Sequence, residues 1–164
     1  MRSKAPNDSR SFRHATLADS DAIAAVINRA FRCEQFFHAG DRTNPDEVRS
    51  FIGKGTFLIA EDDSGIFGCV YLEKRGDRYY LGLLCIDPAR QRSREGSRLM
   101  DAAEDYCREC QARAIDLKIV NLRTELPPYY SRRGYVETGT APWPADAETS
   151  QPCHFITMSK YLSD

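Results

Sequence analysis

The residues best suited to chemistry lie in a basic turn, residues 89–98, which carries four arginines and a glycine. An apolar segment precedes this turn, and a helical pattern follows it. Backbone N–H groups at the start of a helix have no intrahelical partner, and the helix dipole adds partial positive charge there. Together with four guanidinium groups, such a turn suits a polyanion such as a pyrophosphate. A solvated, charged surface turn is the alternative that the composition leaves open.

Two neighbouring elements must hold this turn in place. Residues 81–86 are nearly all apolar, which predicts a strand covered on both faces, and Pro88 ends its hydrogen-bond ladder. After the turn, apolar residues recur at the spacing of a helix. The inner face of this predicted helix holds Leu99, Met100, Ala103, Tyr106, Cys107 and Cys110. Residues 115–120 follow it, so the right-handed crossover rule makes them a strand parallel to residues 81–86.

Two motifs resemble those of the GNAT superfamily of N-acetyltransferases. The segment Pro88-x-x-Gln91-x-x-Arg94-x-Gly96 is similar to the family's coenzyme A signature, Q/R-x-x-G-x-G/A, which lies between a strand and a helix. Residues 129–135, Tyr-Tyr-Ser-Arg-Arg-Gly-Tyr, resemble the later Y-x-x-x-G-F/Y segment. The order and separation of the two motifs fit the family, as does the order of elements from about residue 11 onward.

One residue departs from the family pattern: Arg94 stands where the first glycine of the signature is usual. A residue that enters the first turn of a helix can have ordinary α dihedrals, which any residue adopts. Arg90, Arg92 and Arg98 keep the local field positive. We therefore expect Arg94 to have helical dihedrals and to leave cofactor binding intact.

The resemblance implies acetyl-CoA as the cosubstrate and no metal. It implies that backbone groups of Leu84, Cys85 and Ile86 pair with the pantetheine arm and polarise the acyl carbonyl. Asn121, at the end of the parallel strand, would bond the pantetheine as well, although its link to the second motif is longer than usual. The pyrophosphate would be held by backbone amides of Gln91, Arg92, Ser93, Arg94, Glu95, Gly96 and Ser97.

Acetylation of an amine by a thioester needs a proton for the leaving thiolate and a base for the amine. Tyr130, four residues before Gly134, matches the family's tyrosine that protonates the departing sulfur. A phenol is a credible acid toward a thiolate in a desolvated cleft. A core aromatic with a locally bonded hydroxyl is the alternative for Tyr130. Its neighbour Tyr129 faces another side of the same helix and is expected to pack.

The base for the amine is harder to assign, because residues 78–86 hold no carboxylate. Glu34 is the first candidate, since it follows the first helix into residues 32–44, where aromatic and charged residues lack a clean period. This segment is either a pocket wall or a helix end followed by a turn. The other candidates, besides a chain of mobile waters, are His38, Asp41 and His154.

The whole chain predicts an α/β (α+β) fold in one domain, residues 11–164, after a flexible segment, residues 1–10. We expect a GNAT-like, mostly antiparallel sheet of about six to seven strands, with helices on both faces and one splayed parallel pair. The helices begin at Thr16 (capped with Asp19), at Pro45, after the basic turn and at Leu126. The strands cover residues 12–15, 56–60, 66–73, 78–86, 115–120, 135–139 and 155–161.

The composition excludes several function classes. With 23 basic and 24 acidic residues and a net charge of −1, the chain lacks a bulk attraction to nucleic acid or membranes. No apolar run approaches the roughly 20 residues that span a bilayer, and the polar N-terminus is unlike a signal peptide, so we expect a cytoplasmic protein. In that reducing compartment the six cysteines predict free thiols, and Cys107 and Cys110 lack a second pair that would suggest zinc.

The sequence therefore predicts an acetyl-CoA-dependent N-acetyltransferase. It would transfer the acetyl group to a primary amine of a small molecule, or to an exposed amino group of a peptide, by direct attack in a ternary complex. The alternative is an acyl-CoA-binding module without turnover, in which Arg94 has compromised the turn. We expect no nucleic-acid or membrane partner, and a homodimer stays open. The acceptor itself is not predicted, because acceptor pockets in this fold are built from variable loops.

Overall fold

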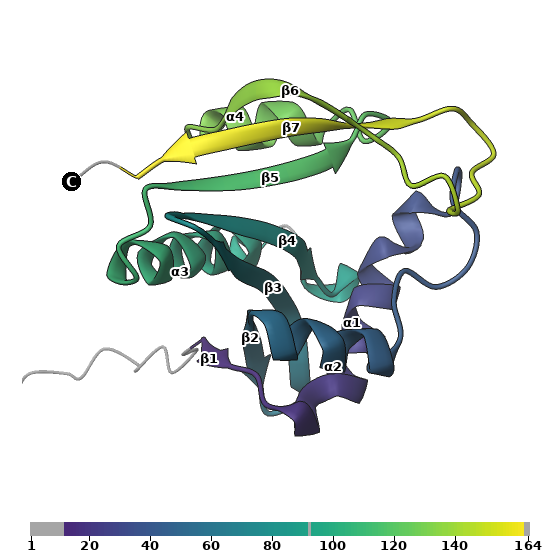
Figure 1. Cartoon of the computed structure of the whole chain (residues 1–164). Coiled ribbons are helices and arrows are strands. Elements are labelled where there is room, and N and C mark those ends of the chain that lie inside the picture. Colours follow the sequence, from purple (N-terminus) through teal and green to yellow (C-terminus); the bar gives the residue numbers. More distant parts are fainter. Residues whose placement is uncertain (1–11, 92, 163–164) are drawn as a thin grey trace, which may run out of the picture.

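A computed structural model describes residues 12–91 and 93–162. Its strands form one sheet in the order β1-β2-β3-β4-β5-β7-β6 (Figure 1). The strands are β1 (Arg13–His14), β2 (Thr56–Asp62), β3 (Gly65–Arg75), β4 (Arg78–Ile86), β5 (Ala114–Val120), β6 (Val136–Pro142) and β7 (His154–Tyr161). The helices are α1 (Ser20–Ala30), α2 (Pro45–Lys54), α3 (Glu95–Glu109) and α4 (Leu126–Arg132), with short 3-10 turns η1 (Leu17–Asp19), η2 (Phe31–Glu34) and η3 (Pro88–Arg90).

The pairing of the strands confirms the predicted mixed sheet. β4 and β5 pair in parallel, and the other neighbouring strands pair antiparallel. The helix α3 connects the parallel pair, as the crossover rule requires. The chain returns through β7, which pairs with both β5 and β6.

Two cores lie on opposite faces of the sheet, and β3 contributes to both by alternation. Val70 and Leu72 pack with Leu99 and Met100 of α3 on one face, where Tyr130 of α4 joins the same core. Cys69 and Tyr71 point to the other face and pack against α1 and α2. Figure 1 shows the same layering, with α3 and α4 behind the sheet and α1 and α2 in front. Residues of β3 contribute to the two cores in turn, because successive side chains of a strand point to opposite faces of the sheet.

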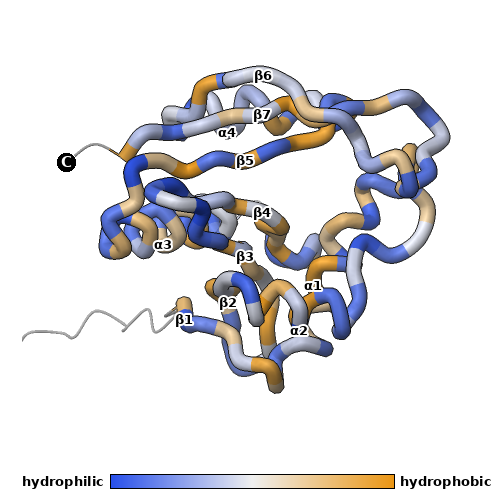
Figure 2. Tube along the Cα trace, in the orientation of Figure 1, coloured by the Kyte–Doolittle hydropathy of each residue, from blue (hydrophilic) through white to orange (hydrophobic). Residues whose placement is uncertain are grey.

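The helices α1 and α2 cover only half of their face. Their core contains residues of β2, β3 and β4 but none of β5, β6 or β7. On this side β5 presents Asp116 and Lys118, which pair in register with Ser159 and Thr157 of β7. Figure 2 shows the resulting alternation of hydrophobic and hydrophilic segments along β5. The second half of this face is thus polar and open, and we call it the open half-face.

Most predicted boundaries agree with the structure to within two or three residues, and β4 has the predicted bounds 78–86. The expected capping box between Thr16 and Asp19 is present. Cys110 is a wrong prediction: it is exposed, because α3 ends at Glu109 and Gln111 then turns the chain with a φ of 60°. In the described part of the chain, no helix is long and apolar enough to cross a membrane.

Candidate active site

The central feature of the site is a bulge that bends β4 away from β5. Cys85 pairs with Cys69 and Gly82 pairs with Tyr71, so two residues of β4 face one residue of β3. Leu83 in the bulge has a φ of 53°, which is unusual for a non-glycine residue. A bulged strand bends, and its ladder is locally broken.

As a consequence, the parallel ladder between β4 and β5 is short. It covers residues 78–80 of β4 and 114–116 of β5, and its last pair is Tyr80 with Asp116. Beyond this pair the two strands diverge (Figure 1). The backbone of Leu84, Cys85 and Ile86 therefore has no strand partner on the β5 side. An extended ligand could supply the missing hydrogen bonds.

The turn after β4 is held by its own side chains. The Asp87 carboxylate accepts a hydrogen bond from the Ala89 N–H, and Gln91 Nε2 donates to the Ile86 carbonyl at 3.2 Å. The Ser93 hydroxyl donates to the Arg90 carbonyl. Arg92, a predicted cofactor residue, lies outside the described residues. These bonds keep the chain compact as it approaches the first N–H groups of α3.

The helix α3 begins differently from our expectation. Arg94 is its N-cap residue and has a φ of 65° in the left-handed region, so the prediction of ordinary α dihedrals is wrong. Its backbone adopts the conformation that glycine adopts most easily, which explains why glycine is usual here. The Arg94 side chain is exposed. Glu95 is buried. A side chain would fit at Gly96, since an added Cβ would meet the nearest atom, Ile86 Cγ1, only at 3.7 Å. Ser97 completes the first turn.

Tyr130 lies in the core between α4 and the sheet, with 6% of its surface exposed. Its ring makes edge contacts with Tyr129 and Tyr135, whose ring centroids lie at 5.1 and 5.6 Å. The phenol makes no hydrogen bond to any described residue, so the locally bonded alternative is not what the structure contains. Burial raises the pKa of the Tyr130 phenol above its usual value, with a further contribution from Tyr129. The group therefore stays protonated and can donate.

Glu34 lies at the end of η2, and its side chain is 12% exposed. Burial raises the pKa of its carboxyl group, although the Arg123 guanidinium at 3.6 Å opposes the shift. A carboxylate with a raised pKa is a better base than an ordinary one. Arg123 also acts electrostatically on Tyr130, so the same guanidinium is a neighbour of both candidate catalytic groups.

The remaining candidates are less well placed for catalysis. Asp41 and His154 are exposed, and His38 packs edge-on against Trp143 with 6.2 Å between ring centroids. Asn121 binds β7 through its side chain, since Asn121 Oδ1 accepts a hydrogen bond from the His154 N–H at 2.9 Å. The Asn121 side-chain nitrogen makes no hydrogen bond to a described residue.

Sequence reasoning missed a cavity of about 250 Å³ on the open half-face. Arg75, Tyr80 and Lys118 line it, at the point where β4 and β5 begin to diverge. These residues come from three strands, so no local motif contains them. The polar positions that alternate along β5, Asp116 and Lys118, were the one available signal.

Solved structures of acetyltransferases share this fold. A protein assigned as a phosphinothricin N-acetyltransferase is 20% identical, with a TM-score of 0.77 over 94% of this chain and 99% of that one. The ribosomal-protein-S18-alanine N-acetyltransferase of Escherichia coli is 16% identical, with a TM-score of 0.74 over 94% of each chain. A Bacillus anthracis protein (strain Ames) assigned as a streptothricin acetyltransferase, solved with acetyl coenzyme A, is 18% identical. Its TM-score is 0.57 over 67% of this chain and 64% of that one.

Fold and site thus define a transferase of the acetyltransferase class. The model of the acetyltransferase (GNAT) domain matches residues 21–152, and the chain therefore belongs to the GNAT acetyltransferase family. This confirms the resemblance that the two motifs indicated, and with it the predicted enzyme class. No curated protein gives a significant match to the sequence.

Proposed function

We propose that this protein is an acetyl-CoA-dependent N-acetyltransferase that acts on a primary amine in a ternary complex. The observation that carries this proposal is the divergence of β4 from β5 at the Leu83 bulge, directly before the basic turn and the start of α3. One continuous segment then offers unpaired strand backbone for a pantetheine arm and helix N–H groups for a pyrophosphate. The acetyl coenzyme A bound by one structural neighbour supports the choice of cosubstrate.

The cofactor would lie along residues that the chain supplies in order. Leu84, Cys85 and Ile86 would pair with the pantetheine amides, and Asn121 would bond the same arm from β5. The pyrophosphate would meet the backbone of the turn between Gln91 and Ser97, Arg92 included. The basic side chains add charge-assisted hydrogen bonds there.

The transfer itself would use Tyr130 and Glu34. The neutral amine nitrogen attacks the thioester carbonyl carbon and forms a tetrahedral intermediate, whose oxyanion the backbone at the bulge stabilises. Glu34 takes a proton from the attacking nitrogen, directly or through water. The carbon–sulfur bond then breaks, and the Tyr130 phenol gives its proton to the departing thiolate. The products are the acetylated amine and the free thiol of coenzyme A.

We take the acceptor to be an amine of a small molecule or of a peptide. The structural neighbours leave both open, because their names include a ribosomal protein and small molecules. A reaction that consumes acetyl-CoA belongs where acetyl-CoA is made, and we keep the cytoplasmic location as part of the proposal.

The test separates binding from turnover. Acetyl-CoA should raise the unfolding temperature, and thiol release with a panel of primary amines should exceed the rate without amine. Stabilisation by acetyl-CoA without thiol release from any amine would favour the acyl-CoA-binding module. Neither stabilisation nor release would reject both.

A further inference from the structure

The cavity on the open half-face lies beside the proposed reaction site. Tyr80 lines it, and Tyr80 belongs to the last parallel pair before β4 diverges. We call this cavity the acceptor pocket, because it opens on the α1/α2 side, where Glu34 also lies near Arg42.

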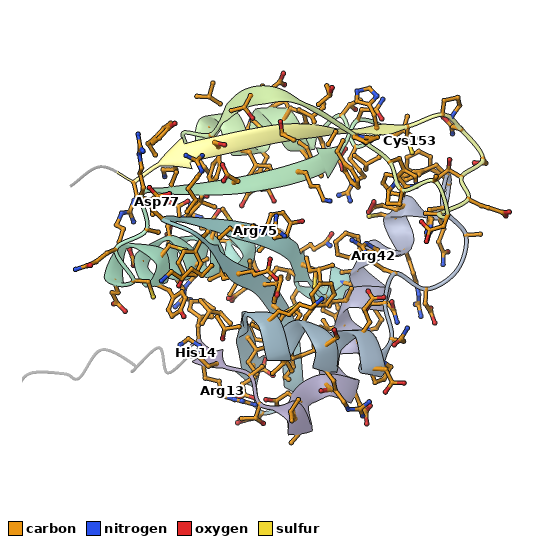
Figure 3. All side chains as sticks on the ribbon, viewed as in Figure 1. Arg13, His14, Arg42, Arg75, Asp77 and Cys153 are labelled. Atoms are coloured by element: carbon orange, nitrogen blue, oxygen red, sulfur yellow. The ribbon has the colours of Figure 1, made fainter. Side chains whose placement is uncertain are left out.

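Three cations surround the acceptor pocket. Arg75 and Lys118 line it, and Arg42, from the segment before α2, acts electrostatically on Lys118. Figure 3, viewed from the α1/α2 side, shows Arg42 and Arg75 along the space between β4 and β5. All three side chains contact aromatic rings: Arg42 lies over Phe31, Arg75 over Tyr80 at 4.2 Å, and Lys118 over Phe155 at 4.5 Å.

Two of these cations form no direct ion pair within the described residues, although Glu34 lies close enough to Arg42 to interact with its charge. Neither Arg42 nor Lys118 forms an ion pair there, whereas Arg75 donates to Glu73 at 2.8 Å. The nearest acid that lines the pocket, Asp116, is already engaged: it accepts two hydrogen bonds from Arg78 and one from Ser159. The pocket therefore keeps positive charge although the chain as a whole has a net charge of −1.

The cations also act on one another. Burial lowers the pKa of Lys118 first, and Arg75 and Arg42 lower it further. Like charges held close together cost free energy, and an anion in the pocket would offset that cost. Cationic side chains that can donate hydrogen bonds suit a small oxyanion such as a carboxylate.

The far end of the site is closed by a contact between two loops. The Ser150 N–H donates to the Phe37 carbonyl at 2.9 Å, and the Ser150 hydroxyl donates to the Phe36 carbonyl. Trp143 packs between Phe37 and Phe155, with ring centroids at 6.0 and 4.9 Å. Figure 1 shows these loops meeting beside α1. This bridge joins the segment after α1 to the loop between β6 and β7.

We propose that the acceptor is a small amine that carries a carboxylate, an amino-acid-like molecule, and that Lys118 and Arg42 bind its carboxylate. This inference rests on the proposed acetyl transfer and adds the substrate class. The carboxylate occupies the acceptor pocket, while the amine points past Tyr80 toward the thioester. Arg75, paired with Glu73, stacks on Tyr80 and shapes the wall.

The experiment measures thiol release with matched acceptors: the proteinogenic L-amino acids and their α-carboxamides. The amide keeps the amine and the side chain but lacks the charge. For the best amino acid, kcat/KM should exceed that of its amide by about tenfold or more, the worth of one charge-assisted hydrogen bond. Lys118→Gln and Arg42→Gln should each reduce that preference severalfold. Lys74→Gln removes an exposed lysine of β3 that lies outside the pocket and should leave the preference unchanged.

The outcomes separate this inference from the proposed function. Release with amides or other neutral amines at equal or higher kcat/KM overturns the carboxylate site and leaves the acetyl transfer standing. The same holds if a peptide is a far better acceptor than any amino acid. If no amine releases thiol, the acetyl transfer fails, and calorimetry with the same amino acids and amides decides the binding claim alone. Equal binding of acid and amide, or binding unaffected by Lys118→Gln, then overturns it.

Discussion

Tyr130 is the residue on which the proposed chemistry most depends. It is buried, it lacks a hydrogen-bond partner in the described structure, and burial raises the pKa of its phenol. We predict that Tyr130→Phe keeps acetyl-CoA affinity but lowers kcat by a factor of roughly 10² to 10⁴, because only the proton donor is removed. Tyr129→Phe is the matched control on the same helix. Equal turnover of the two variants would make Tyr130 a packing residue.

Glu34 gives a prediction for the pH dependence. Its raised pKa means that the proton is held more tightly in the folded than in the unfolded state, so the carboxylate forms only as the pH rises through the higher, native value. Protonated Glu34 therefore makes its full contribution to the stability of the fold at a pH below the unfolded pKa. This contribution is lost as the pH rises through the native pKa. The base is therefore available on the alkaline side of this window.

We predict an acidic limb in the pH profile of kcat/KM that Glu34→Gln removes. The variant should also lose about tenfold to a hundredfold of kcat/KM near neutral pH, because a general base is gone. Glu125→Gln is the control, since Glu125 contacts the same Arg123 but is largely exposed. An unchanged acidic limb in Glu34→Gln would assign the base to another group or to water.

Arg94 gives a stability prediction. Its φ of 65° strains a residue that has a Cβ, so Arg94→Gly should stabilise the fold by about 0.5 to 1 kcal/mol. Acetyl-CoA affinity should stay equal or weaken by up to about tenfold, with a shallower salt dependence, because a positive charge near the pyrophosphate is lost. Gln111→Gly is the control: its φ of 60° predicts a similar gain in stability far from the turn, with affinity unchanged. Chemical denaturation and calorimetry measure the two effects. Tighter binding by Arg94→Gly would mean that Arg94 obstructs the cofactor.

At the residue scale, the sequence identified candidate residues but not the environment of their side chains. Tyr130 and Glu34 were found by motif and position, whereas their burial depends on packing between distant elements. The φ of Arg94 escaped prediction because arginine, unlike glycine, gives no signal for a left-handed conformation. Lys118 and Arg42 were missed because they are far apart in the sequence and interact electrostatically only in the folded chain.

At the scale of elements, the bulge in β4 explains the site. The hydrophobic pattern predicted the strand and its bounds, since its nearly continuous apolar residues and its terminal proline are local features. The bulge at Leu83 was not predicted, because it depends on the register between β3 and β4. Only the family resemblance predicted that β4 and β5 diverge. The local sequence pattern thus predicts the strands, whereas the pairing between strands determines where β4 and β5 diverge.

The position of α3 is fixed by a buried carboxylate. Glu104 accepts hydrogen bonds from Lys160 of β7 at 2.7 Å and from the Tyr135 hydroxyl at 3.2 Å, and Arg133 lies at 3.5 Å. Glu104→Ala should lower the free energy of unfolding by about 2 to 4 kcal/mol, because it leaves the partly buried Lys160 ammonium and the buried Tyr135 hydroxyl without their acceptor. Glu109→Ala, at the exposed end of the same helix, should change it by less than about 0.5 kcal/mol. Denaturant titration compares them. A small loss in Glu104→Ala would show that packing alone holds α3.

At the scale of the whole molecule, the two faces of the sheet have different tasks. One face is closed by α3 and α4 around a continuous core that includes Tyr130. The other is closed only over β2 to β4, which leaves the open half-face with its cations exposed. One face is thus filled by helices, whereas the other keeps an open surface with a cavity. Because the charges of the whole chain balance, the composition does not reveal the cations on the open half-face.

The most direct test of the proposed function measures two products in one reaction. Purified protein is mixed with acetyl-CoA and the best acceptor, and free thiol and N-acetylated acceptor are quantified together over time. We predict that both appear in a one-to-one ratio, that both require the amine, and that both slow together in Tyr130→Phe. Thiol that appears at the same rate with and without the amine, or acetyl-CoA that binds and is never consumed, would contradict N-acetyl transfer by this protein.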